Sequence, residues 1–386
     1  LWAACSHSRS FCCGAGAAGY SAAMQIGSPA KSSTFNAGFA IGGKGGSGGD
    51  GAQVSVVNAG AIVTYGPAHS IGIMAQSVGG GGGSGGSAHS TNWNLSYKLP
   101  GGDAPSEPGT NAALAVRVGG DSGAGGDGKA VSVSNRGAID TTGHDSAGIF
   151  AQSVGGGGGD AGQASGIYAF PAPLTDRTPV YQQVSISVGG TAKASGSGGT
   201  VGVTQRGDIH TRGLGSAGIY AQSVGGGGGQ GGTGAAGATG TVAIGGAPVD
   251  GIVTKPFPKD PGKALESSFG IFAQSVGGGG GHAGNATFFG IPKDTDMNAL
   301  GGLTIGIGLG IDLKGGNSGN GGKVAVTSAG NILTYGPNAV GIFAQSVGGG
   351  GGLSGNLGLG TAGLSSLGTL LGSTGGNGSA DTVTVS

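Results

Sequence analysis

The residues with the clearest catalytic potential form the sequence Gly-Asp-Ser-Gly at Gly120–Gly123. A serine there would act as a nucleophile if a histidine took its proton and an acid oriented that histidine. Only His7, His69 and His89 precede it, and no protease-domain pattern surrounds them. Related segments fill the same slot with GGKGGSGGDG and GGNSGNGG. We therefore predict no catalytic residues and interpret the chain as a non-enzyme.

The carboxylates offer no catalytic pair. Glu107 and Glu266 are the only glutamates, and Asp140 and Asp208 fall at non-equivalent positions of a repeat described below. Enzymes that hydrolyse glycosides need two acids flanking one bond. A β-helical glycan-active enzyme is therefore a disfavoured alternative.

Metal-binding patterns are incomplete. Cys5, His7, Cys12 and Cys13 could ligate zinc, but they lack paired C-x-x-C spacing. Residues 45–53 approach a calcium-binding nonapeptide, which works only in tandem copies, and there is one copy. We expect neither a metal nor a cofactor.

An Arg-Gly-Asp tripeptide, a cell-attachment signal in some matrix proteins, occurs at Arg206–Asp208. Other versions of its slot read NRGA, NAGA and SAGN, which are repeat turns. We therefore interpret the tripeptide as a turn.

Composition excludes several classes of protein. The 386 residues include 100 glycines, and 17 basic residues balance 17 acidic ones. A nucleic-acid partner would require a basic surface, so none is expected. No apolar run approaches the ~18 residues of a membrane-spanning helix. The chain begins at Leu1 without a signal peptide, and we expect it to be an internal piece of a longer protein.

A repeat organises the glycine. Five copies of a block such as SAGIFAQSVGGGGG follow one another, and the numbers of their glutamines increase by 76, 70, 52 and 71. Four copies are preceded by a second element such as KAVSVSNRGAIDTTG. These positions define about five imperfect units of roughly 52–76 residues. The constant residues, which we predict to be structural, are Gly72, Gln76, Gly148, Gln152, Gly218, Gln222, Gly270, Gln274, Gly341 and Gln345.

Each element of the repeat has the alternation of a β-strand. Val131 and Val133 alternate with small polar residues, and Ile149 to Val154 alternates between two faces. Strand, turn, strand, turn and strand fit into about 20 residues, which predicts one coil of a β-solenoid and about three coils per unit. We expect glycine where corners need positive φ or close backbone approach, with Gly148 among these positions. The invariant glutamine is predicted to satisfy a turn or a ladder, although a ligand-binding role is an alternative.

The phrase GIFAQSVGGGGG, preceded by V-x-V-x-N-x-G-x-I-x-T-x-G, resembles the glycine-rich passenger repeats of bacterial autotransporter proteins. The resemblance covers most of 39–386, while residues 1–38 match no repeat and are left unassigned. It implies an all-β, right-handed parallel β-solenoid that is exported through an outer-membrane β-barrel translocator. It also implies a location at the cell surface, tethered to the outer membrane.

We therefore predict an extended, surface-displayed or secreted passenger that acts as a stalk or adhesin. Its expected partners are a host-cell or abiotic surface, or further copies of itself. The first alternative is a secreted glycine-rich fibre or matrix protein. An ice-binding solenoid is a minor option, because regular Thr-x-Thr rows are missing.

Overall fold

The chain is described by a computed structural model, and the residues that it describes form β-strands as their only regular elements. The described residues are 19–27, 34–96, 110–169, 180–213, 215–227, 234–238, 242–244, 268–279, 286–289, 307–310, 318–329, 331–334, 339–350, 357–360, 367–370 and 378–386. Within these ranges there is no helix long and apolar enough to cross a membrane.

The strands form six sheets, and all pairings between the described strands are parallel. Sheet I contains β1 (Gly19–Gly27), β6 (Ala88–Ser96), β11 (Ala164–Ala169), β19 (Ala286–Phe289) and β24 (Leu357–Gly360). Sheet II contains β2 (Thr34–Ile41), β7 (Thr110–Val118) and β12 (Val180–Val188). Sheet III contains β3 (Val54–Asn58), β8 (Val131–Asn135), β13 (Val201–Gln205), β16 (Gly234–Ala238), β21 (Val324–Ser328) and β26 (Val383–Val385).

The remaining sheets follow in chain order. Sheet IV contains β4 (Ile62–Thr64), β9 (Ile139–Thr142), β14 (Ile209–Arg212), β17 (Val242–Ile244) and β22 (Ile332–Thr334). Sheet V contains β5 (Ile73–Val78), β10 (Ile149–Val154), β15 (Ala217–Val224), β18 (Phe269–Val276) and β23 (Val340–Val347). Sheet VI pairs β20 (Ile307–Gly310) with β25 (Leu367–Leu370).

Each strand pairs with its counterpart one whole repeat unit away. Gln152 of β10 lies opposite Gln76 of β5 on one side and opposite Gln222 of β15 on the other. The prediction of about three short coils per unit is therefore wrong. Coils of about 20 residues would pair each strand with one about 20 residues away. Instead, Val131 of β8 lies opposite Val54 of β3 on one side and opposite Val201 of β13 on the other.

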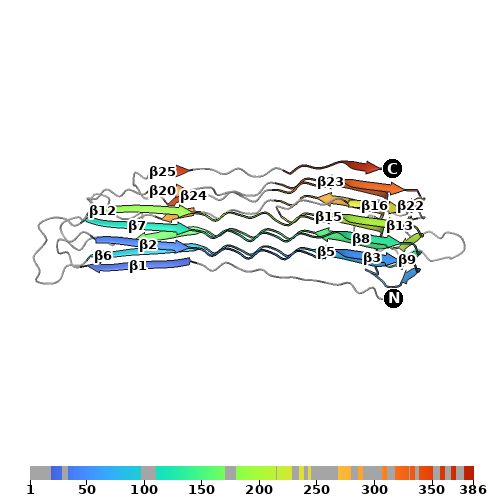
Figure 1. Cartoon of the computed structure of the whole chain (residues 1–386), viewed down its shortest axis with the longest axis horizontal. Coiled ribbons are helices and arrows are strands. Elements are labelled where there is room, and N and C mark those ends of the chain that lie inside the picture. Colours follow the sequence, from blue (N-terminus) through green and yellow to red (C-terminus); the bar gives the residue numbers. More distant parts are fainter. Residues whose placement is uncertain are drawn as a thin grey trace, which may run out of the picture.

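The layers have two β-structured ends joined by undulating segments (Figure 1). Strands of sheets I and II lie at one end, and strands of sheets III, IV and V lie at the other. Residues 19–27 and 34–38, which precede the repeats recognised in the sequence, pair in register with β6 and β7 at the first end. The sheets thus extend into the N-terminal part of the chain.

Sheets III, IV and V enclose the hydrophobic core. Val131 and Val133 from β8 pack with Ile139 of β9 and Ile149 of β10, and all four side chains are at most 1 % exposed. The inward residues are those that the alternating sequence pattern indicates. The same set recurs in the neighbouring layers, so the core is a column of stacked isoleucine, valine and alanine.

The segments between the two ends have a three-residue period of hydrogen bonds. Along residues 42–51, every third backbone N–H donates to the next unit; the pairs are Gly42–Val118, Gly45–Asp121, Gly48–Ala124 and Gly51–Asp127. Within the same unit, every third backbone N–H of residues 80–86 donates to a carbonyl of residues 43–49; the pairs are Gly80–Gly49, Gly83–Gly46 and Gly86–Gly43. A period of three is that of the polyproline II helix, which has no internal hydrogen bonds and leaves its backbone groups available to neighbours. We call the segments with this period that follow sheet II, such as residues 42–51, and those that follow sheet V, such as residues 79–86, the two polyproline II layers.

Close packing of these segments explains many of the described glycines. A Cβ atom at Gly120 would overlap with the carbonyl of Gly43, and one at Gly156 would overlap with that of Gly80. Among the described glycines, positive φ occurs only at Gly143, Gly213 and Gly215. Of the two reasons expected for glycine, close backbone approach therefore dominates, as it does at the axis of collagen.

Candidate functional surface

One outward surface carries the same or similar side chains in all five units. It comprises the outer side of sheet V and of the glycine segment that follows each strand, and we call it the ladder face. In β5 the side chains of Ile73, Ala75 and Ser77 are buried, while Met74 and Val78 are 45 % and 46 % exposed. Its four rows are Met74, Phe150, Tyr220, Phe272 and Phe343; Gln76, Gln152, Gln222, Gln274 and Gln345; Val78, Val154, Val224, Val276 and Val347; and Gly81, Gly157, Gly227, Gly279 and Gly350.

The first row is a stack of aromatic rings. The ring centroids of Phe150 and Tyr220 are 4.9 Å apart, those of Tyr220 and Phe272 are 4.5 Å apart, and all three rings are nearly parallel. Phe343 continues the stack at 5.0 Å from Phe272. Burial in the stack raises the pKa of the Tyr220 phenol. Because each ring covers the faces of its neighbours, the stack presents ring edges to the outside.

The second row is a continuous ladder of side-chain amides. The Nε2 atom of Gln76 donates to Oε1 of Gln152 at 2.6 Å, and Gln152 donates to Gln222 at the same distance. Gln222 donates to Gln274 at 2.7 Å, and Gln274 donates to Gln345 at 2.6 Å. Each amide thus satisfies its neighbour, and substitution of one glutamine would leave two polar groups unpaired.

The fourth row consists of glycines that packing does not require. A Cβ atom at Gly157 or Gly350 would meet nothing within 4 Å. At Gly81, Gly227 and Gly279 the nearest atom would lie 3.8, 3.6 and 3.8 Å away, which is ordinary van der Waals contact. These positions have room for a side chain, and yet each of the five units has glycine there.

The glycine that precedes the isoleucine of each sheet V strand is tightly packed at Gly72, Gly148 and Gly270. A Cβ atom at Gly148 would lie 2.5 Å from Cγ2 of Ile209 and 2.7 Å from the carbonyl oxygen of Gly218. At Gly72 the carbonyl oxygen of Gly148 would be 2.6 Å away. The backbone there makes close contact with the next layer, without positive φ. Gly270 is confined in the same way by Gly341, whereas the Cβ of Gly341 would meet only Ile332, at 3.9 Å.

On the inner side of the same strands, a row of serines connects sheet V to the start of sheet III. The Oγ atoms of Ser77 and Ser153 accept the backbone N–H groups of Lys129 and Gly199, at 2.9 and 2.8 Å. Ser153 also donates to the Lys129 carbonyl at 2.9 Å. This role of the serine in the AQSV phrase is not apparent from the sequence, because the backbone N–H group that it accepts belongs to the following unit.

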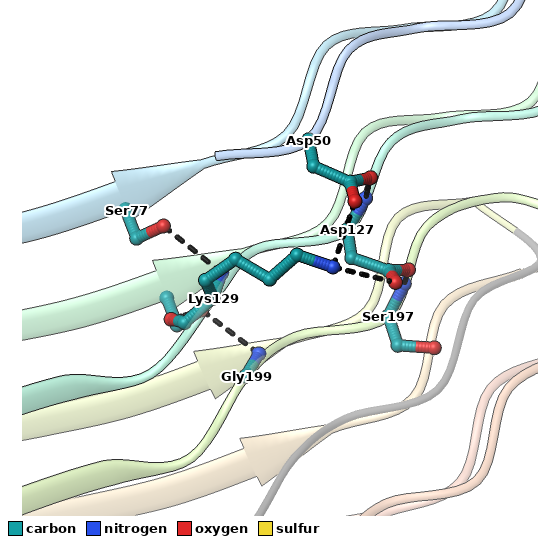
Figure 2. A network of polar contacts seen from close by, with 7 residues as sticks. Asp50, Ser77, Asp127, Lys129, Ser197 and Gly199 are labelled. Atoms are coloured by element: carbon teal, nitrogen blue, oxygen red, sulfur yellow. Dashed lines mark hydrogen bonds and ion pairs between the residues drawn. The ribbon is translucent and has the colours of Figure 1, made fainter. Parts of the chain in front are cut away.

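Beside this junction, two aspartates and a lysine link three units (Figure 2). Lys129 Nζ lies 2.8 Å from Asp50 Oδ2 and 3.1 Å from Asp127 Oδ2. Asp50 accepts the backbone N–H of Asp127 at 2.8 Å, and Asp127 accepts that of Ser197 at 2.9 Å. The hydrogen bonds from Lys129 and from the Asp127 amide lower the pKa of Asp50, and those from both aspartates raise the pKa of Lys129. The two carboxylates therefore accept hydrogen bonds from backbone N–H groups of the polyproline II layer in the next unit.

The Gly-Asp-Ser-Gly sequence lies in that same layer. Ser122 is fully buried, and its Oγ accepts the Lys193 backbone N–H at 2.8 Å and donates to the Gly123 carbonyl at 3.3 Å. Asp121 accepts both the amide and the hydroxyl of Thr191 and pairs with Lys193 at 3.0 Å. Burial by itself raises the pKa of Asp121, but the hydrogen bonds from Thr191 and Lys193 lower it on balance. The contacts of both side chains hold adjacent layers together.

The Arg-Gly-Asp tripeptide forms the turn between β13 and β14, with exposed Arg206 and Asp208. Behind this turn runs a second amide ladder that the sequence analysis missed. Asn58 donates to Asn135 at 2.7 Å, and Asn135 donates to Gln205 at 2.7 Å and to the Gly137 carbonyl at 2.7 Å. The available signal was the amide residue that ends three of the four V-x-V elements, at Asn58, Asn135 and Gln205; the fourth ends in Ser328.

No group of three or more histidine, cysteine, aspartate or glutamate side chains that could hold a metal occurs among the described residues. Cys5, His7, Cys12 and Cys13 lie outside that part of the chain. Comparison with protein-family models, with curated proteins and with solved structures finds no match in any of the three.

Proposed function

We propose that the chain is a right-handed parallel β-solenoid in which each repeat unit forms one coil. The support is the register of the pairings, in which strands of one unit lie opposite the equivalent strands of the next. Right-handedness follows the rule for crossovers between parallel strands. A coil of this kind runs out along one polyproline II layer and returns along the other.

We propose further that this solenoid is the surface-displayed passenger of an autotransporter and acts as an adhesin. The observation that carries the proposal is the ladder face. It repeats an amide, a valine and a glycine position through five units, beside a bulky position that is Met74 in the first unit and aromatic in the other four. Repeated weak contacts on one rigid surface add up to strong attachment without any single strong site. The outer-membrane translocator would lie in a part of the protein outside this chain.

The coil length favours an adhesin over a simple spacer. Neighbouring strands are separated by about 4.8 Å, so each unit adds only about 4.8 Å to the height of the stack. Successive coils contain 76, 70, 52 and 71 residues. A stalk of coils this long would gain little reach, whereas the same coils make a broad face.

Deletion of whole units tests the proposal. Removing residues 153–222 joins Gln152 directly to Ser223, and removing 77–152 joins Gln76 to Ser153, so that each junction restores the AQSV phrase. We expect arrays displayed on a cell to lose attachment gradually as one and then two units are removed. Matched point variants, Ser122→Ala, Asp121→Asn and His144→Ala, should leave attachment unchanged.

An enzyme would respond in the opposite way, because one lost catalytic group lowers a rate by orders of magnitude. Glycan turnover and proteolysis are therefore measured on the same arrays. Turnover that is abolished by one of the point variants would overturn the adhesin proposal. Attachment that is unchanged by the double deletion would overturn it as well.

A further inference from the structure

The uniformity of the ladder face is not shared by the other outward surfaces. At one outward position of the opposite polyproline II layer, the first three units have Lys44, Asp121 and Thr191. On sheet III, one outward row reads Ser55, Ser132, Gly202 and Ala325. Stacking and amide bonding account for the first two rows of the ladder face, but contacts within the chain do not account for an open row of glycine. A constraint from outside the chain would explain it.

We propose that the ladder face is an interface between two copies of this chain. The copies face each other with their strands antiparallel, so that the aromatic row of one lies against the glycine row of the other. The proposal rests on the solenoid described above and names a second copy as the partner of the adhesin.

The spacing of the rows suits this arrangement. With about 3.3 Å per strand residue and about 3.1 Å per polyproline II residue, the aromatic and glycine rows are roughly 22 Å apart, and the midpoint falls between the glutamine and valine rows. A half-turn about an axis parallel to the stack therefore places aromatic against glycine and glutamine against valine. Both copies repeat every 4.8 Å or so, which allows all layers to match at once. Bulky side chains then face bare backbone, as interdigitating layers require.

The chemistry of the face also favours a second copy. None of its four rows contains a charged residue. Its amides are paired along the ladder, which lowers the cost of covering them. The faces between neighbouring rings are occupied by stacking, so a sugar would find no open ring face between them. The Phe269 ring also packs at a steep angle against Phe272 and Phe343, which leaves the edges of Phe150 and Tyr220 for a partner. Ladders of glutamine and stacked aromatics are typical of the dry interfaces between paired β-sheets.

The size of the face predicts a weak dimer. Five layers of about 4.8 Å by roughly 22 Å give about 500 Å² per copy, below the ~800 Å² of a standard interface. Association should therefore depend on concentration, and it should strengthen as units are added.

Sedimentation of the full chain over a range of concentrations tests the interface. We expect a monomer–dimer equilibrium that Gly157→Lys weakens by at least tenfold, since the open position accepts the side chain while the charge enters the interface. The matched control is Ala124→Lys, at an outward position of the opposite layer, which should leave the equilibrium unchanged. A chain that stays monomeric at all concentrations, or equal weakening by both variants, would overturn the proposal.

Disulfide trapping tests the antiparallel arrangement. In a background with Cys5, Cys12 and Cys13 replaced by serine, Phe150→Cys and Gly157→Cys are prepared as separate proteins. We expect the mixture to form disulfide-linked heterodimers on mild oxidation, while neither protein alone forms linked dimers efficiently. Linked homodimers of Gly157→Cys that form as readily would overturn the antiparallel facing. Dimerisation in solution without attachment to surfaces would contradict the adhesin and support the interface.

Discussion

At the scale of single residues, neighbouring glycines of one run have different reasons to be glycine. Gly156 faces the carbonyl of Gly80 in the adjacent layer, and Gly157 faces open space. The three-residue period alternates residues that face another backbone with residues that face outward. The role of each glycine therefore depends on its position within the three-residue period.

Substituting these two glycines separates the roles. Gly156→Ala should destabilise the protein by about 1–3 kcal/mol or more, because the methyl group forces two backbones apart. Gly157→Ala should change the stability by less than about 0.5 kcal/mol, as at an ordinary surface position. Urea unfolding followed by circular dichroism measures both. Equal effects would contradict the assigned phase.

Asp50 and Asp121, at two different outward positions of the polyproline II layer that follows sheet II, predict sensitivity to acid. The pKa values of Asp50 and Asp121 are lowered in the folded protein. Their ionised forms therefore stabilise the fold above the unfolded pKa of about 3.9, and this contribution is lost as the pH falls through the folded values.

We expect the urea midpoint of the native chain to fall below about pH 4. The double variant Asp50→Asn, Asp121→Asn should depend less on pH over this range. Its amide oxygens can still accept backbone N–H groups, as that of Asn320 accepts the Ser379 N–H at 2.9 Å. An identical pH dependence in both proteins would contradict the roles given to these carboxylates.

At the scale of elements, polar ladders fix the places where strands end. Asn135 ends β8 and is fully buried, and its amide holds the turn to β9 through the Gly137 carbonyl. The same amide joins the layers on both sides through Asn58 and Gln205. A buried polar group of this kind is tolerated because all its bonds are made.

Asn135→Ala should therefore cost about 2–4 kcal/mol, since it removes three hydrogen bonds at a buried position: the one accepted from the Asn58 amide and those donated to Gln205 and to the Gly137 carbonyl. Thr204→Ala, at an exposed position of β13, is the control and should have little effect. Thermal unfolding of the two variants gives the comparison. A cost for Asn135→Ala no larger than that of the control would contradict a structural role for the ladder.

At the scale of the whole molecule, the chain is a stack in which each layer contacts only its neighbours. Stability in such arrays is approximately a sum of terms for units and for the interfaces between them. Units of 76 and 52 residues stack in the same column, because the core strands keep their register while the connections vary in length.

Removal of 153–222 should accordingly give a folded protein whose stack is about 4.8 Å shorter by small-angle scattering, with a lower unfolding midpoint. The control deletion of 188–222, about half a unit, joins Ser187 of β12 to Ser223 and removes β13, β14 and most of β15, the strands of sheets III, IV and V, from that layer. It should lower the midpoint further or prevent folding. Similar behaviour of the two deletions would contradict one coil per unit.

The sequence by itself determined the local structure. The alternation of Ile149, Ala151 and Ser153 with Phe150, Gln152 and Val154 indicated a strand and its two faces, because side chains in a strand point alternately to opposite sides. The repeat also indicated that equivalent positions of successive units lie opposite one another. Both are properties of neighbouring residues or of internal repetition.

Only the tertiary structure decided which strands pair. A repeat is equally consistent with pairing within a unit and with pairing between units, and the prediction of short coils took the nearer partner. The structure places β8, β9 and β10 in separate sheets and pairs each across a whole unit. The physical reason lies in the glycine segments, which pack as polyproline II helices against other layers and carry the chain to the far end before it returns. Whether a glycine such as Gly156 must be small depends on the backbone of Gly80, one whole unit earlier in the chain, and no local pattern contains that contact.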